Sequence, residues 1–338
     1  MSIAMDFEPD AARAVALDRR MNRELGLSLE HVAEQARGHA AFDRAGLGAL
    51  VAHLLAGGRV RPGVFGRYYD LVHAIDAEDR AEIERLMGEL AAAAPMPPEL
   101  EITALGDATL GRDSALYMRK WQTGGNKNIG FREPSAEIAQ AFRPRLADGL
   151  ALLESALPEL HGEIRAIVHQ VVIAGSDPDT KLQFDGGSHY QLWGALFLNG
   201  HFHPDRVAVA EVLAHESAHS LLFGFCTHMA LVDNDDDAVF SSPLRRDPRP
   251  MDGIYHATFV SARMHWAMTA LARSGALTDE EAARAHAAAE ADRRNFYAGH
   301  GVVAEHGLLT PVGTELMAGA KAYMESVGAP EEALATAG

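Results

Sequence analysis

Two histidines and a glutamate at the spacing H-E-x-x-H are the residues of this chain best suited to chemistry. They are His215, Glu216 and His219, in the stretch DRVAVAEVLAHESAHSLLFGF (residues 205–225). If this stretch is helical, the two histidines lie one turn apart on the same face. Two imidazoles so placed can bind one divalent metal ion. Glu216 would lie close enough to reach a water molecule or a substrate at that ion.

The stretch around these residues has the features of a buried helix. Asp205 follows Pro204 and is suited to be the N-cap. Small or apolar residues occupy the other faces, which is typical of a helix covered all round. Because histidine and glutamate are costly to bury without partners, their presence indicates a metal site rather than a chance match. Glu211, one turn before His215, is a candidate to accept a hydrogen bond from that imidazole.

Composition limits the classes of protein and partner. The chain has 338 residues, 48% of them hydrophobic, which predicts a folded globular protein with two domains. The net charge of −17 disfavours nucleic acids and anionic membranes as partners. A single cysteine, Cys226, excludes an internal disulfide framework. The sequence shows no signal peptide and no apolar run long enough to cross a membrane, so we expect a cytoplasmic protein.

The pattern of residues predicts a mainly α protein with a small β-sheet, an α+β fold. Residues 1–95 have helical spacing throughout and form the expected N-terminal helical region. PMPPEL, at residues 95–100, is typical of a linker. We therefore expect residues 96–338 to form a metal-binding catalytic domain with a helical C-terminal tail.

A β-strand is expected directly before the metal helix. LWGALFLNG, at residues 192–200, has a strand composition and is followed by HFHPD. Zinc peptidases of the zincin type hold extended peptides along an edge strand that precedes their metal helix. Since an edge strand offers unpaired backbone groups, this stretch is a candidate substrate-binding edge. The alternative is an ordinary interior strand.

The third metal ligand decides the chemistry of the site. The metzincin pattern needs a glycine and a histidine where this chain has Leu222 and Phe225, so it does not apply. A gluzincin needs a later glutamate, and none occurs before Glu280. The acids near that position are better explained as the first turn of a helix that Thr278 caps.

His256 is the best candidate for the third ligand. It lies in MDGIYHATFVSARMHWAMTALARSG, residues 251–275, which reads as a long buried helix. A single histidine on an apolar helix is more often a core residue with its hydrogen bonds satisfied. The need for a third ligand favours metal binding here. His265, on the same helix, is the fallback.

An arginine-rich loop precedes that helix. SSPLRRDPRPMDG, at residues 241–253, places arginines including Arg245 and Arg249 among prolines, which stiffen the loop. Arginine binds carboxylates through two parallel hydrogen bonds, so the loop indicates an anionic co-substrate beside the metal. The alternative is a solvated basic turn that answers the acidic run at residues 233–237. Arg263, two turns beyond His256, is a further candidate.

The combination of HESAHSLLFG, SSPLRRDPRP and MDGIYHATFVSARM resembles the bacterial HExxH-motif peptide-modification proteins. The resemblance covers roughly residues 160–275. These proteins are 2-oxoglutarate-dependent peptide β-hydroxylases associated with ribosomal peptide natural products. The resemblance implies Fe(II) as the metal, O2 and 2-oxoglutarate as co-substrates, and a peptide substrate. It also implies that His215, His219 and His256 hold the metal and that Arg245 or Arg249 holds the 2-oxoglutarate carboxylate.

Three functions follow as hypotheses. The first is an Fe(II)/2-oxoglutarate oxygenase that hydroxylates the β-carbon of a residue in a peptide, or of a free or carrier-bound amino acid. In that reaction Glu216 would order a water molecule or orient the ligands. The second is a zinc peptidase, in which Glu216 is the general base. The third, a protein with a purely structural metal, is disfavoured because structural sites usually have four ligands, often cysteines.

Overall fold

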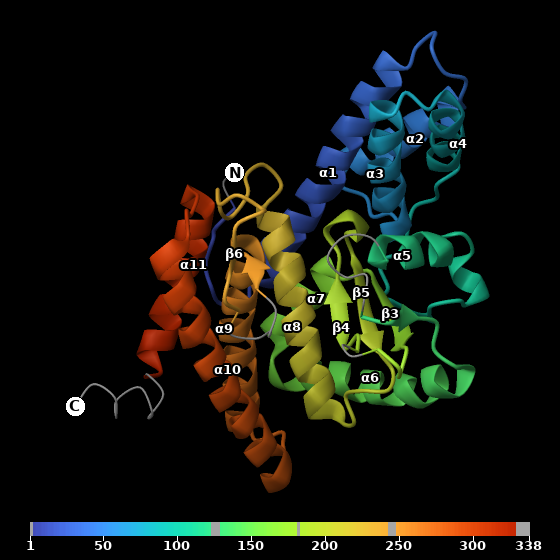
Figure 1. Cartoon of the computed structure of the whole chain (residues 1–338). Coiled ribbons are helices and arrows are strands. Elements are labelled where there is room, and N and C mark those ends of the chain that lie inside the picture. Colours follow the sequence, from blue (N-terminus) through green and yellow to red (C-terminus); the bar gives the residue numbers. More distant parts are fainter. Residues whose placement is uncertain (1–2, 123–128, 181–182, 243–247, 329–338) are drawn as a thin grey trace. The chain divides into compact units, whose positions relative to one another are not determined.

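The computed structural model describes residues 3–122, 129–180, 183–242 and 248–328. Helices dominate the structure and a small mixed β-sheet accompanies them, which confirms the expected α+β class (Figure 1). Contacts divide the chain into two compact units. One, which we call the sheet unit, comprises Ala14–Pro144 and Arg165–His203. The other, the helical unit, comprises Met1–Arg13, Arg145–Ile164 and Pro204–Gly338.

The sheet has the strand order β1-β3-β5-β4, with β2 paired to β3. Parallel pairing joins β1 (Glu101–Ala104), β3 (Gln170–Ser176) and β5 (Ala195–Asn199). The short strands β2 (Phe131–Arg132) and β4 (Gly186–Ser188) pair antiparallel. All residues of β3 and β5 are buried, as expected for parallel strands with both faces covered.

The expected edge strand lies in the interior of the sheet. β5 pairs with β3 on one side and with β4 on the other, so the interior alternative is correct. The physical reason is visible in its composition, because ALFLN is apolar on both faces and suits a fully buried position. At this end of the strand order the last described strand is β4.

The remaining elements of the sheet unit are mainly helices. They are α1 (Ala11–Gln35), which begins in the other unit, α2 (Arg44–Leu55), α3 (Pro62–Asp76), α4 (Arg80–Ala91), η1 (Ala108–Leu110), α5 (Asp113–Trp121) and η3 (Tyr190–Leu192). Aromatic rings fill the core between α5 and the sheet. Trp121 contacts Phe131, Phe184 and Phe197 at centroid distances of 5.3–5.5 Å.

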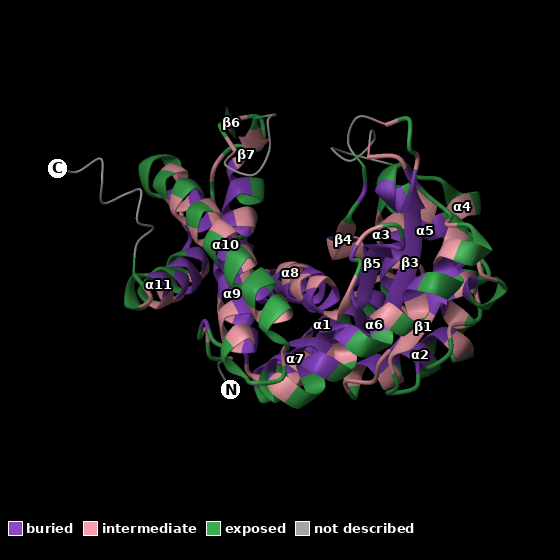
Figure 2. Ribbon diagram, turned by 90° about the horizontal axis from the view of Figure 1, so that it is seen from below, coloured by how far each residue is buried: buried purple, intermediate pink, exposed green. Residues whose placement is uncertain are grey.

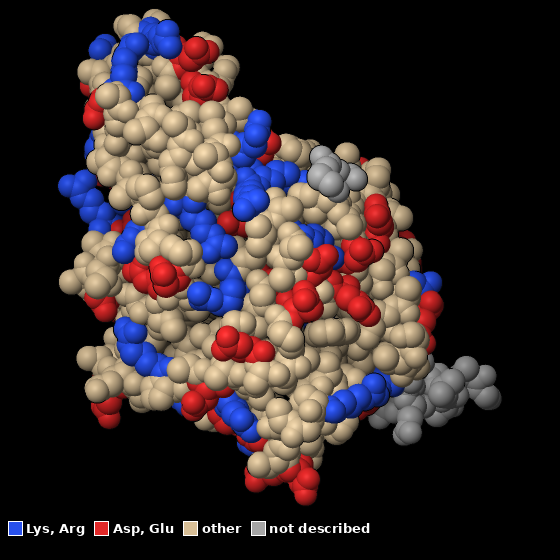
Figure 3. Space-filling view, turned by 180° about the vertical axis from the view of Figure 1, so that it is seen from behind, with Lys and Arg blue, Asp and Glu red and all other residues tan. Residues whose placement is uncertain are grey.

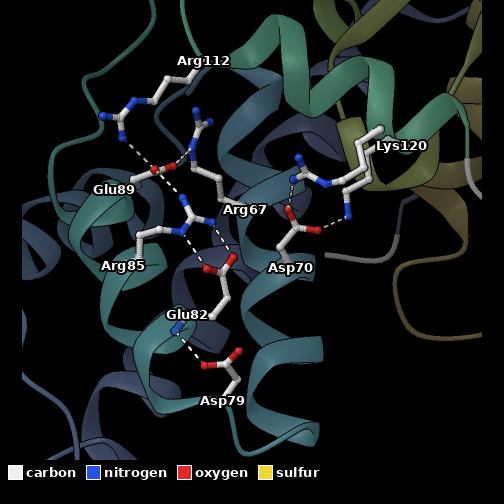
Figure 4. A network of polar contacts seen from close by, with 9 residues as sticks. Arg67, Asp70, Asp79, Glu82, Arg85, Glu89, Arg112 and Lys120 are labelled. Carbon is white, nitrogen blue, oxygen red and sulfur yellow. Dashed lines mark hydrogen bonds and ion pairs between the residues drawn. The ribbon is translucent and has the colours of Figure 1, made fainter.

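A network of ion pairs joins α3 to α4 and α5 (Figure 4). The guanidinium of Arg67 contacts Glu89 at 2.9 Å and Asp113 at 2.6 Å. Farther along α3, Asp70 accepts a hydrogen bond of 2.7 Å from Lys120. Because these groups are mostly shielded from water, the network fixes the three helices more firmly than exposed ion pairs would.

The helical unit contains the predicted metal helix, α8 (Arg206–Phe225), and its partner α9 (Met251–Arg273). Its other long helices are α10 (Asp279–His306) and α11 (Pro311–Ser326). The hairpin of β6 (Val239–Phe240) and β7 (Arg249–Pro250) precedes α9. Parts of α6 (Ala136–Ala156) and α7 (Pro158–Ile167) complete the unit. Figure 2 shows that most of α8 and α9 is buried, as the apolar sequence of both predicts.

Surface charge is mixed rather than segregated. On the face in Figure 3, acidic and basic side chains form small scattered groups among uncharged residues. Nucleic-acid binding usually relies on a continuous basic surface, which this face does not present over the residues that are drawn in colour. Within the described ranges, none of the helices is long and apolar enough to cross a membrane.

Candidate metal centre

The metal helix begins where the sequence predicts. The side chain of Asp205 accepts hydrogen bonds from the backbone N–H of Val207 at 2.9 Å and of Ala208 at 3.1 Å, so this residue is the N-cap. Helical spacing then brings the ring centroids of His215 and His219 to 5.0 Å from each other. The prediction of the helix and of its start is confirmed.

Three potential ligand atoms gather on α8. One atom each from His215, Glu216 and His219 lies within 4.8 Å of the other two, close enough to share one ion. Nε2 of His215 lies 3.7 Å from Oε1 of Glu216. The glutamate side chain is only 6% exposed, whereas that of His215 is 32% exposed. A metal ion beside this shielded carboxylate would offset part of the cost of burying its charge.

His256, the predicted third ligand, lies directly against this group. Its ring stacks on that of His219 with a centroid distance of 5.3 Å and an angle of 13°. The Nδ1 atoms of the two rings are 3.1 Å apart. Phe223 covers the ring of His256 at 5.4 Å. The packing of α9 on α8 therefore places a histidine from a second helix beside His219, while the group of ligand atoms within 4.8 Å of one another consists of His215, Glu216 and His219.

Both stacked rings are held in the neutral form that binds metals. Removal from water lowers the pKa of His219 well below its usual value, and the neighbouring His215 and His256 lower it further. Burial also lowers the pKa of His256, while the carboxylate of Asp252 acts in the opposite direction. A neutral imidazole keeps a lone pair for a metal ion near pH 7.

Two further residues that interact with side chains of α8 were not singled out by the sequence. Sδ of Met264, on α9, lies 3.0 Å from Nδ1 of His215. Asp292, on α10, is 4% exposed, and burial followed by the charge of Glu211 raises its pKa to about 8. The sequence could have indicated Asp292, because it is an aspartate at a position on the buried face of α10. The hydrogen bond predicted from His215 to Glu211 stays a prediction.

The three candidate arginines have different positions. Arg245 lies outside the described residues. Arg249 is half-buried in β7 and stands just before the first turn of α9, the helix that carries His256. An arginine at the N-terminal end of that helix is suited to attract an anion.

Arg263 occupies a structural position. Its guanidinium forms a buried ion pair with Glu163 and donates a hydrogen bond of 2.6 Å to the carbonyl oxygen of Phe7. Arg13 contacts the other oxygen of Glu163 at 2.9 Å. A co-substrate would have to displace Glu163 from Arg263, so we leave this arginine out of the proposed site. Arg263 lies two turns beyond His256 on the same helix, as the spacing predicts, but its side chain binds the internal carboxylate of Glu163.

The fallback ligand is also engaged elsewhere. Nδ1 of His265 lies 2.8 Å from the hydroxyl of Tyr323 on α11. Burial lowers the pKa of His265 to about 4. This ring belongs to the contact between α9 and α11, which leaves His256 as the third ligand of choice.

Comparisons with protein-family models and with curated proteins give no match to this chain. A functional interpretation therefore depends on what the residues of the centre can do.

Proposed function

We propose that this protein is a non-haem Fe(II)/2-oxoglutarate-dependent oxygenase that hydroxylates the β-carbon of an amino-acid residue in a peptide. The observation that supports it most is the position of His256 against His219, with 3.1 Å between their Nδ1 atoms. From there His256 would supply a third imidazole to the H-E-x-x-H pair. Three protein ligands leave positions for a co-substrate and O2, as a catalytic centre requires.

The donor set is compatible with iron. Imidazoles suit Fe(II), as they suit zinc, although three histidines depart from the two-histidine, one-carboxylate triad that is usual for non-haem iron oxygenases. The lowered pKa of His219 and of His256 favours the neutral rings that a metal needs. The residues that would hold the metal are His215, His219 and His256. When bound, Fe(II) would supply the activation of O2 that is coupled to oxidation of 2-oxoglutarate.

Arg249 would hold the anionic co-substrate. The residue is half-buried and is followed by the N-terminal end of α9, where the partial positive charge of the helix adds to that of the guanidinium. A guanidinium can clamp a carboxylate by two parallel hydrogen bonds. Arg245 is the second candidate, from the sequence alone.

Glu216 would orient the centre rather than perform the oxidation. Its carboxylate lies 3.7 Å from Nε2 of His215 and is shielded from water. From there it can hold a water molecule or the imidazole in place by hydrogen bonding. The side chain would bind no part of the 2-oxoglutarate.

A zinc peptidase is the second candidate function. It is favoured by the buried carboxylate of Glu216 within the group of potential ligands. In this reaction Glu216 would take a proton from the attacking water, and the metal would polarise the peptide carbonyl. The two functions differ in their requirement for 2-oxoglutarate and O2.

Anaerobic reconstitution with Fe(II), followed by 2-oxoglutarate, tests the proposal. We expect a weak visible charge-transfer band and, once O2 is admitted, formation of succinate. His256→Ala should lose both, whereas His286→Ala, which removes an exposed histidine of α10, should keep both. Stoichiometric zinc that iron does not replace, together with no binding of 2-oxoglutarate, would overturn the proposal in favour of the peptidase.

A further inference from the structure

Asp252 stands beside the third histidine of the centre. It belongs to the first turn of α9, four residues before His256, so the two side chains are neighbours on the helix. Oδ1 of Asp252 lies 3.8 Å from Nε2 of His256. The other ring nitrogen, Nδ1, faces His219 at 3.1 Å. The two nitrogens of His256 therefore face different groups: Nε2 faces the carboxylate of Asp252, and Nδ1 faces the ring of His219.

This arrangement matches a general requirement of metal-binding imidazoles. A histidine that gives one nitrogen to a metal keeps its proton on the other, and a hydrogen bond from that N–H fixes both the tautomer and the ring orientation. Carboxylates are common acceptors for it. The carboxylate of Asp252 lies on the Nε2 side of the His256 ring, as this arrangement requires.

We propose that Asp252 is a positioning residue of the metal centre, which accepts the Nε2–H of His256 and so directs Nδ1 of this ring to the metal. The proposal rests on the metal centre of the proposed function, but not on the identity of the metal. The distance of 3.8 Å is longer than a hydrogen bond, so the proposal requires the exposed side chain of Asp252 to move closer to the ring when metal binds.

A simpler role for Asp252 makes a different prediction. Acidic residues in the first turn stabilise a helix through its dipole, whatever the helix carries. The side chain is 56% exposed, which suits such a role. In that case its removal lowers the stability of the protein and leaves the affinity for metal unchanged. Asp279, an exposed acid in the first turn of α10, offers a matched control.

Metal binding to the full-length, metal-free protein separates the two roles. Titration with Zn²⁺ and with Co²⁺ in a calorimeter should show that Asp252→Ala weakens binding by roughly 10–100-fold. Asp252→Asn should lose less, because its amide oxygen still accepts a hydrogen bond. Asp279→Asn should bind metal like the parent protein. Equal metal affinity in all of these proteins would overturn the proposal.

The protonated nitrogen of His256 gives a second readout. Two-bond ¹H–¹⁵N correlation spectra of the zinc-bound protein should assign the proton to Nε2, and Asp252→Ala should shift that signal. A proton on Nδ1 would also overturn the proposal. Neither measurement involves 2-oxoglutarate. If the Asp252 variants change metal affinity and the spectra as expected but the oxygenase assay fails, the proposed function is rejected and the role of Asp252 stands. If Asp252→Ala does not fold, Asp252→Asn and the spectra still decide.

Discussion

Nδ1 of His219 lies 3.1 Å from Nδ1 of His256, although 37 residues separate the two in the chain. The contact exists because α9 packs along α8 and brings the second turn of one helix against the H-E-x-x-H face of the other. At this distance one neutral ring can donate its N–H to the bare nitrogen of the other, so a hydrogen bond joins them in the metal-free protein. A metal ion would take the place of that proton and bind the lone pairs of both rings.

The first prediction concerns the metal-free protein at acid pH. The pKa of His219 is lower in the folded state than its ordinary value of 6.5, so the unfolded chain binds more protons below that pH. The free energy of unfolding should therefore fall as the pH drops below 6.5, and zinc should oppose the loss. Urea denaturation between pH 5 and 8 measures it. The double variant His219→Phe/His256→Phe should show a flatter pH profile, and an unchanged slope would contradict this account.

Asp292 gives a pH dependence of the opposite sign. Its pKa rises from 3.8 to about 8 in the folded protein, because of burial and then of Glu211. The folded state therefore keeps a proton that the unfolded chain releases, and stability should decrease as the pH rises from about 4 to about 8. Asp292→Asn should remove most of this slope while keeping the shape of the side chain. Parallel profiles for the variant and the parent protein would show that Asp292 does not titrate in this range.

The ion-pair network around Glu89 in the sheet unit should contribute more to the free energy of unfolding than an exposed ion pair does. Glu89 accepts hydrogen bonds from Arg67 at 2.9 Å, Arg85 at 2.6 Å and Arg112 at 2.8 Å (Figure 4). Its loss leaves three guanidinium groups close together, so Glu89→Ala should lower the free energy of unfolding by about 1–3 kcal/mol. Arg80→Ala breaks an exposed pair and should change it by no more than about 0.5 kcal/mol. Equal effects of both substitutions in denaturant titrations would count against a network.

Local signals explain which parts of this structure were predictable. Asp205 as N-cap and the course of the metal helix follow from residues within a few positions of each other. His256 was reached by eliminating other third ligands. The sequence could not predict that β5 is an interior strand, because its partner β4 is a Gly-Gly-Ser segment without a hydrophobic pattern. The hydrogen bond between Arg13 and Glu163 spans 150 residues, a separation at which sequence spacing carries no information.

Asp252 and Arg263 show that spacing along a helix does not predict which group a side chain contacts. Both stand at helical spacing from His256, at four and seven residues. The nearer one faces the ring at 3.8 Å, and the farther one is satisfied by Glu163. Spacing identifies the face of a helix, but the partner on that face depends on how the neighbouring helices pack.

Arg249 and Arg263 should therefore respond differently to substitution. Arg263→Gln leaves Glu163 with fewer partners in a dry environment and should destabilise the protein by roughly 3–5 kcal/mol. The folded fraction of that variant should still bind 2-oxoglutarate with the parent affinity. Arg249→Gln should destabilise the protein less than Arg263→Gln, since the residue is only half-buried, and should weaken 2-oxoglutarate binding at least tenfold through loss of a charged hydrogen bond. Thermal unfolding and anaerobic titration of the iron-loaded protein measure both quantities. If Arg263→Gln loses the co-substrate at low temperature, where it is folded, the structural role assigned to this arginine is wrong.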